Sequence, residues 1–351
     1  MTSDVIQLLA SNNIHYYGSA ELLKYEEYMS RYFEREYERW HGNKRSPESY
    51  GVSSFNGDIV DKDTYFNSID HYNKELSIYQ AFLDKCYMAY SMAYYGATEN
   101  SKEIINHISL EQAQEEKYKL IIERAGIEDG QNILEIGCGF GGFIKYVLQN
   151  YTNTTVTGIN PSSIQAEYIQ KVLEIDHSRF KFIQQHFGES VCNAMPLNSY
   201  DRIISIGAFE HFSNFDLLFK YQSNLLKPGG KCLHHLIVSA DTIPHFLNAE
   251  NTLMADYFPG GHIWPYAELK RHNTHLQFID SWFVNGMNYW MTLDAWHKRF
   301  WQAVDHLYPD YLSLDEVQDW NKYFVLSKTM FCPNQGRSYG VGHYLYEKSQ
   351  S

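Results

Sequence analysis

The chain has 351 residues, with 29 Lys and Arg against 42 Asp and Glu, which leaves a formal charge of −13 at pH 7. Such an acidic balance argues against nucleic acid or an anionic membrane surface as a partner. No apolar run approaches the ~18 residues of a membrane span, so we expect no membrane-spanning segment. At roughly 150 residues per domain, the length allows a large domain with additions, or two domains.

The cysteines and histidines do not form the patterns of a disulfide framework or a metal site. The five cysteines are scattered and contain no C-x-x-C pair, which is typical of reduced thiols in a cytoplasm. The sixteen histidines include no H-E-x-x-H motif, so we expect no bound metal. We therefore expect a cytoplasmic globular protein. Its aromatic content of 16% is typical of apolar pockets with polar rims.

The N-terminal part is polar and rich in Tyr and Glu. Apolar residues at spacings of three and four predict a helix over Glu21–Trp40. A stretch rich in Gly, Ser, Pro and Asn follows at His41–Asp58 and predicts a linker. We therefore divide the chain into an N-terminal helical extension, 1–65, and a main domain, 66–351. A further helical region is expected at Tyr72–Tyr95.

A capping box opens the next helix. Ser109 and Gln112 stand three residues apart, so each side chain can bond the other's backbone N–H. This helix should run to about Ala125, where Gly126 can adopt the left-handed cap conformation.

From residue 131 onward, short apolar strands alternate with helices. This alternation predicts an α/β fold in which a mostly parallel sheet carries helices on both faces. Between about 240 and 290 the alternation stops, which predicts a lid insertion over the carboxyl ends of the strands, where the acceptor would bind. The expected strands are Asn132–Ile136, Thr155–Ile159, Arg179–Gln184, Arg202–Ile206 and Lys231–Val238, and the expected helices are Phe143–Gln149, Ser162–Leu173 and Leu217–Leu226.

A glycine-rich loop follows the first of these strands, in the run Glu135-Ile-Gly-Cys-Gly-Phe-Gly-Gly142. Gly137, Gly139 and Gly141 let the backbone turn tightly and approach a ligand, and the next helix offers unpaired N–H groups. The loop also fits a dinucleotide fingerprint, but that fingerprint expects an acidic residue about 20 positions later, where this chain has Asn160. The loop matches the first motif of class I S-adenosylmethionine methyltransferases. A glycine turn without a ligand is the remaining interpretation.

Several blocks together carry a resemblance to a known family. The chain resembles the cyclopropane fatty acid and mycolic acid cyclopropane synthases, a family that also includes coclaurine-type plant N-methyltransferases. The resemblance implies a class I methyltransferase fold, related to the Rossmann fold, over about Ser68 to the C-terminus. The blocks are Tyr90–Tyr94, Ser109–Gln114, Ile133–Gly142, Gly158–Gln165, Ser205–Phe212, Lys227–Gly230, Leu233–Ile237, Phe258–Gly261 and Tyr289–Leu293.

The resemblance implies that S-adenosylmethionine is the cosubstrate. The three glycines would lie against its methionyl part, and the side chains after the second strand would hold its ribose. The implied cofactor-binding residues are Tyr90, Ser91, Glu135, Gly137, Gly139, Gly141, Asn160 and Gln165.

The resemblance also implies a catalytic group. In cyclopropane synthases a bicarbonate ion serves as base and is held by a Cys, a Glu, a His, a Tyr and a backbone carbonyl. The matching positions here are Met92 in place of the Cys, Glu210, His235, Tyr289 and the carbonyl of Ile237. Bicarbonate is therefore a candidate second ligand, and Glu210, His235 and Tyr289 are the candidate catalytic residues.

The residues alone leave other roles open at these positions. Glu210 could bond backbone donors at a helix start, and Tyr289 could belong to an aromatic core. His234 and His235 alternate on one strand, so only one of them can face the cleft.

The expected function is methyl or methylene transfer to carbon of an apolar, unsaturated acyl chain or natural product. The alternative is N-methylation of a small hydrophobic amine. A nicotinamide-dependent oxidoreductase and a catalytically idle cofactor-binding scaffold are the competing classes. The expected partner is a small-molecule or acyl-chain substrate, and assembly as a homodimer stays open.

Overall fold

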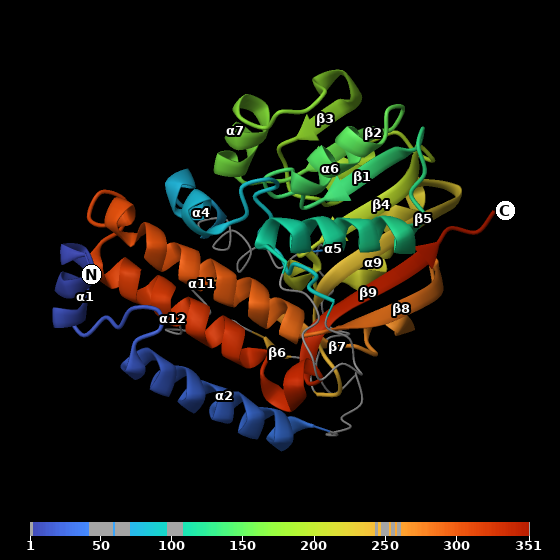
Figure 1. Cartoon of the computed structure of the whole chain (residues 1–351). Helices are drawn as coiled ribbons and strands as arrows, with labels where there is room; N and C mark the ends of the chain where they lie inside the picture. Colours follow the sequence, from blue (N-terminus) through green and yellow to red (C-terminus); the bar gives the residue numbers. More distant parts are fainter. Residues whose placement is uncertain are drawn as a thin grey trace.

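A computed structural model gives the three-dimensional structure of the chain (Figure 1). It describes residues 3–41, 59, 71–96, 108–242, 245–246, 253, 257 and 261–350. The linker expected at His41–Asp58 lies outside the described residues except for His41, and so does most of 243–260 within the expected lid. No helix in the described part is long and apolar enough to cross a bilayer.

The described strands form one nine-stranded sheet, of which β1 to β5 are drawn in the upper right of Figure 1. Its order is β3-β2-β1-β4-β5-β7-β6, and β9 and β8 extend it beside β5. The pairs along β3-β2-β1-β4-β5-β7 are parallel, and β9 is antiparallel to both β5 and β8. The strands are β1 (Asn132–Ile136), β2 (Thr155–Ile159), β3 (Phe180–Ile183), β4 (Tyr200–Ile206), β5 (Leu226–Ser239), β6 (His245–Phe246), β7 (His262–Pro265), β8 (Gln277–Asn285) and β9 (Tyr339–Glu347).

Helices cover both faces of this sheet, as the alternation predicted. Adjacent residues of β5 show the two faces: His234 packs against Phe219 of α9, and His235 lies on the side of α5. The predicted α/β fold, a mostly parallel sheet with helices on both faces, is therefore confirmed. The helices of this part are α5 (Leu110–Ala125), α6 (Gly142–Asn150), α7 (Ser163–Lys171), α8 (Glu189–Ala194) and α9 (Phe215–Leu225), with short 3-10 turns η3 (His177–Arg179), η4 (Phe209–His211) and η5 (Leu269–Arg271).

The start and end of α5 are as the sequence predicts. The Ser109 hydroxyl accepts from the Gln112 N–H, and the Gln112 side chain accepts from the Ser109 N–H. Gly126 ends the helix with φ +61 and ψ +48, in the left-handed region.

The helix expected at Tyr72–Tyr95 is much shorter, and that prediction was wrong in extent. Apart from Tyr72 itself, only α4 (Leu76–Phe82) is helical between residues 72 and 95. The chain then turns because both carboxylate oxygens of Asp84 accept backbone N–H groups, from residues 86, 87 and 89, at 2.6 to 3.1 Å. An extended segment follows, and it carries Tyr90 and Ser91 toward the sheet.

The expected lid at 240–290 also differs in part. Residues 277–285 form β8, an edge strand paired with β9, rather than irregular chain over the sheet. Most residues of β8 are partly exposed. Apolar and polar residues therefore do not alternate along it as they do in a strand with one buried face. The lid stays a prediction for the remainder of that segment.

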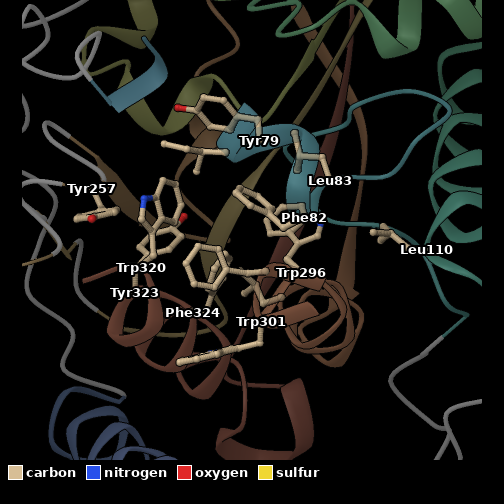
Figure 2. Packing of buried hydrophobic residues seen from close by; sticks show 14 of the residues in the cluster. Tyr79, Phe82, Leu83, Leu110, Tyr257, Trp296, Trp301, Trp320, Tyr323 and Phe324 are labelled. Atoms are coloured by element: carbon tan, nitrogen blue, oxygen red, sulfur yellow. The ribbon is translucent and has the colours of Figure 1, made fainter. Parts of the chain in front are cut away.

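A second layer of helices lies beside the sheet and contains α11 (Met287–Leu307) and α12 (Leu314–Met330), followed by the turn η6 (Pro333–Gly336). An aromatic cluster joins these helices to α4, as Figure 2 shows. Phe82 is its centre, with ring centroids 5.3 Å from Phe324, 5.5 Å from Trp320 and 5.8 Å from Trp296. This cluster fixes α4, and with it the segment that carries Tyr90.

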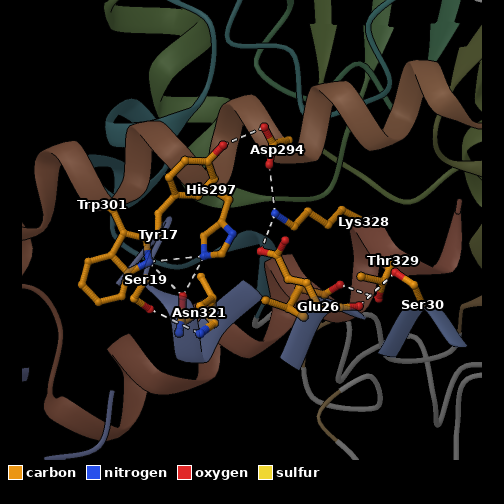
Figure 3. A network of polar contacts seen from close by, with 12 residues as sticks. Tyr17, Ser19, Glu26, Ser30, Asp294, His297, Trp301, Asn321, Lys328 and Thr329 are labelled. Atoms are coloured by element: carbon orange, nitrogen blue, oxygen red, sulfur yellow. Dashed lines mark hydrogen bonds and ion pairs between the residues drawn. The ribbon is translucent and has the colours of Figure 1, made fainter. Parts of the chain in front are cut away.

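The N-terminal helices α1 (Asp4–Ser11) and α2 (Ala20–Trp40) pack on this second layer rather than standing apart. A polar network fastens them (Figure 3): the buried Lys328 ammonium of α12 lies 2.6 Å from Glu26 of α2 and 2.9 Å from Asp294 of α11. The Tyr17 hydroxyl donates to the same Asp294 carboxylate at 2.8 Å. The N-terminal helices are therefore part of the packed structure.

Candidate active site

A cleft lies at the carboxyl ends of β1, β2 and β4. Its walls come from the glycine loop, the start of α7, the extended segment after α4 and the turn after β4. All the predicted cofactor residues line it except Gly141: these are Tyr90, Ser91, Glu135, Gly137, Gly139, Asn160 and Gln165.

Two glycines of the loop have different physical roles. Gly139 has φ +54, and a Cβ added there would meet no described atom within 4 Å, so it would project into open space. Gly141 has φ +79, but its Cβ would come within 2.6 Å of the Leu173 side chain. Gly139 therefore keeps the cleft open for a ligand, whereas Gly141 lets α6 begin close to the segment after α7. The resemblance did not distinguish these roles.

The far side of the cleft carries a polar pair. Asn160, directly after β2, donates from Nδ2 to Gln165 Oε1 at 2.6 Å and to the Gly139 carbonyl at 3.2 Å. Gln165 is held in the first turn of α7, whose N-cap is Ser162. These amides can offer donors and acceptors to the hydroxyls of a ribose.

A buried lysine lies behind the cleft, and the sequence reasoning missed it. Lys117 of α5 donates to Ser91 Oγ at 2.9 Å and to Gln114 Oε1 at 2.6 Å. Burial lowers the pKa of Lys117 and raises that of Glu135, and the attraction between the two groups opposes both shifts. One Glu135 oxygen has no hydrogen-bond partner among the described residues. Its position on the buried face of the predicted helix is the feature of the sequence that could have indicated a buried Lys117.

Glu210 lies in η4, immediately beyond β4. The Ile237 N–H donates to its Oε1 at 2.8 Å, and its Oε2 is buried without a hydrogen-bond partner among the described residues. Burial raises the pKa of Glu210 from 4.5 to about 7, although the bond from Ile237 opposes the shift. This carboxyl can therefore gain or lose a proton near neutral pH.

Four tyrosines interact with one another, in what we call the tyrosine cage: Tyr72, Tyr90, Tyr289 and Tyr323. Burial raises the pKa of both Tyr72 and Tyr289, and the charge of Glu210 adds to both shifts, while the Tyr72 hydroxyl lies 2.9 Å from His211 Nε2. The Tyr90 hydroxyl donates to that of Tyr323 at 3.3 Å. Tyr72 and Tyr90 also line the cofactor cleft, so the cage opens onto it. The sequence did not single out Tyr72 or Tyr323, because aromatic residues in a predicted helix are usually interpreted as part of the hydrophobic core.

The remaining positions of the predicted base site have different surroundings. Tyr289 stacks on Phe331 with centroids 4.7 Å apart while its hydroxyl lies in the field of Glu210. His235 is bonded elsewhere: its Nδ1 lies 2.9 Å from Nε2 of His343. Met92 is buried in an apolar cluster with Val284 and Val341.

His234, the neighbour of His235 on β5, does not belong to the candidate site. His234 stacks on Phe209 at 4.0 Å and is buried on the opposite face of the sheet from His235. In the part of the chain that the structure describes, no group of three or more His, Cys, Asp or Glu side chains could hold a metal ion.

Comparison with known proteins identifies the family. The sequence profile of the mycolic acid cyclopropane synthetase family matches residues 61–338. N-methyltransferase 4 of Papaver somniferum is 28% identical over 256 residues, which are 69% of this chain and 71% of that protein. The cyclopropane-fatty-acyl-phospholipid synthase of Escherichia coli K12 is 30% identical over 246 residues, 69% of this chain and 58% of that one.

Solved structures show the same fold. Coclaurine N-methyltransferase bound to N-methylheliamine and SAH superposes with a TM-score of 0.79, at 19% identity, over 99% of this chain and all of that one. A cyclopropane synthase from Mycobacterium tuberculosis gives a TM-score of 0.68 at 22% identity, over 83% of this chain and all of that one.

The cleft fits the methyl donor of this family. The open space beside Gly139, the polar pair at Asn160 and the unpaired Glu135 oxygen offer a backbone cradle and hydrogen-bonding groups to a nucleoside bearing an amino acid. The family match and the cleft together make S-adenosylmethionine the cosubstrate. The chain belongs to the mycolic acid cyclopropane synthetase family and is an S-adenosylmethionine-dependent methyltransferase.

Proposed function

We propose that the chain methylates the nitrogen of a small hydrophobic amine, which binds in the tyrosine cage against Glu210. One observation carries this proposal. The Glu210 carboxyl is buried, has an oxygen without a hydrogen-bond partner among the described residues, and interacts electrostatically with Tyr72, which also lines the cofactor cleft.

The chemistry of the cage favours an amine over an alkene. An ammonium group donates hydrogen bonds to carboxylate and phenol oxygens, and it is attracted to aromatic faces. Methylation of an alkene would instead create a carbocation, which the same oxygens could capture. A cage lined by Tyr72, Tyr289 and Tyr323 is therefore better suited to hold an N–H cation.

When bound, S-adenosylmethionine supplies an electrophilic methyl group on a sulfonium sulfur. The residues of the chain have to orient the amine, exclude water and remove one proton. Glu210 can take that proton, because its pKa of about 7 matches a base that works near neutral pH. The Ile237 N–H holds one carboxylate oxygen, so the other stays directed to the acceptor.

Transfer to carbon is the second candidate, and a specific observation favours it. The positions that the resemblance assigns to a bicarbonate site retain Glu210, His235 and Tyr289, and Glu210 lies beside Ile237. In this case an unsaturated acyl chain would be the acceptor, with bicarbonate as the base. Against it, Met92 replaces the cysteine ligand and is buried in an apolar cluster.

Incubation with methyl-labelled S-adenosylmethionine distinguishes the two candidates. Parallel reactions would contain hydrophobic secondary amines or vesicles of phospholipids with cis-unsaturated chains, and mass spectrometry would locate the label. We expect label on amine nitrogen and none in lipid carbon. Glu210→Gln should lose the reaction, while Glu167→Gln, which changes a carboxyl on the exposed face of α7, should keep it. Label in lipid carbon alone would overturn the amine proposal.

A further inference from the structure

Three side chains form a row across the sheet on the side of α5. His235 of β5 pairs directly with His343 of β9, and His343 pairs in turn with Trp282 of β8. Arg124, in the last turn of α5, lies over this row with its guanidinium 4.7 Å from the centroid of the Trp282 ring. The row ends at His235, two residues before the Ile237 N–H that holds Glu210.

The hydrogen bonds along this row have only one consistent direction. Arg124 Nη1 lies 2.7 Å from His343 Nδ1, and a guanidinium has donors but no acceptor, so His343 Nδ1 must accept. A neutral His343 then carries its proton on Nε2, which lies 2.9 Å from His235 Nδ1 and donates to it. A neutral His235 must in turn carry its proton on Nε2.

Both imidazoles are in surroundings that keep them neutral. Burial, together with the positive charges of Arg124 and Lys117, holds the pKa of both rings well below the ordinary value. A second proton on His235 would have to go to Nδ1, the atom that already accepts from His343. His235 therefore cannot take up a proton unless the chain of hydrogen bonds breaks.

We propose that Arg124 and His343 are positioning residues that fix His235 as a hydrogen-bond donor through Nε2–H. His235 then orients an acceptor group or a small anion beside Glu210, and the removal of the proton falls to Glu210. The bond at Nδ1 is the hydrogen bond that the described residues make to the His235 ring, which leaves Nε2–H for this contact. The link to catalysis rests on the function proposed above, but the direction of the hydrogen bonds does not.

Nuclear magnetic resonance on the full chain with ¹⁵N-labelled histidine rings tests the proposal. Two-bond ¹H–¹⁵N correlations distinguish the two neutral tautomers, and His235→Gln assigns the His235 signals by their loss. In the wild type we expect a neutral His235 with its proton on Nε2. In His343→Leu, where no donor faces Nδ1, a population with the proton on Nδ1 should emerge.

The kinetic consequence can be separated from a loss of packing. His343→Leu should lower kcat roughly tenfold with the KM for S-adenosylmethionine unchanged, the usual scale for a lost hydrogen bond. His343→Gln keeps an N–H that can reach His235 and should restore most of the rate. Trp282→Leu removes the ring beneath Arg124 but leaves both hydrogen bonds. The His235 tautomer should therefore stay the same, and kcat should change by less than about twofold.

Two results would overturn the proposal. One is a wild-type His235 that carries its proton on Nδ1 or is doubly protonated. The other is a His343→Leu variant in which the His235 tautomer changes while kcat stays at the wild-type value. Because the tautomer is measured without an acceptor, label found in lipid carbon would reject the amine proposal and leave this one standing.

Discussion

Replacing Glu210 by Gln should make the protein more stable and less active. The side chains have nearly the same shape, and the Gln oxygen can still accept from Ile237, so the main change is the loss of a buried ionisable group. Burial raises the pKa of Glu210 from 4.5 to about 7. At 1.36 kcal/mol per pKa unit, ionising this carboxyl in the folded chain costs about 3 kcal/mol relative to the unfolded chain.

The sign of this effect depends on pH. Below pH 4.5 the carboxyl is protonated in both the folded and the unfolded chain, so it does not change the free energy of unfolding. Between pH 4.5 and 7 the carboxyl ionises in the unfolded chain but not in the folded one, so the folded state loses stability as the pH rises. Glu210→Gln should therefore be more stable than the wild type by about 3 kcal/mol at pH 8, and by only about 1 kcal/mol at pH 5. Urea unfolding at both pH values measures this difference. An equal difference at pH 5 and pH 8 would refute the reasoning.

Three further substitutions test separate parts of the structure. Gly139→Val should abolish S-adenosylmethionine binding in calorimetry while the circular dichroism stays that of the wild type, because the new side chain projects into the cleft; unchanged affinity would reject the cofactor assignment. Lys328→Met should destabilise the fold by about 2 kcal/mol, since it leaves two partly buried carboxylates without their cation, whereas Lys171→Met at an exposed pair should leave the stability unchanged. Tyr289→Phe keeps the stacked ring but removes the hydroxyl, so kcat/KM for the acceptor should fall roughly tenfold with cofactor affinity unchanged; an unaltered kcat/KM would place Tyr289 in the core alone.

Local sequence was enough to predict the cofactor half of the site. The first strand, the glycine turn and the next helix are adjacent in the chain, so the position of Gly139 follows from residues within one turn of it. The capping box at Ser109 is equally local, because its two side chains bond each other's backbone.

The acceptor half could not be predicted in the same way, because tertiary packing assembles it. Tyr72 and Tyr323 meet in the tyrosine cage although each lies more than 100 residues from Glu210 in the chain. His343 meets His235 only through the antiparallel register of β5 and β9, and no sequence-based element was assigned to the C-terminal strand. The resemblance placed Glu210, His235 and Tyr289 in one base site, but it carried no information on the direction of the hydrogen bonds at His235.

The pH dependence of methyl transfer in a single turnover tests the central claim most directly, namely that Glu210 removes the proton. With the amine acceptor and S-adenosylmethionine saturating, the wild-type rate should rise with pH through an apparent pKa near 7, because only the carboxylate can accept a proton. Glu210→Gln should bind the cofactor normally, lose roughly 100-fold or more in rate, and show no such inflection. A Glu210→Gln variant that keeps the wild-type rate and the same inflection would contradict the account.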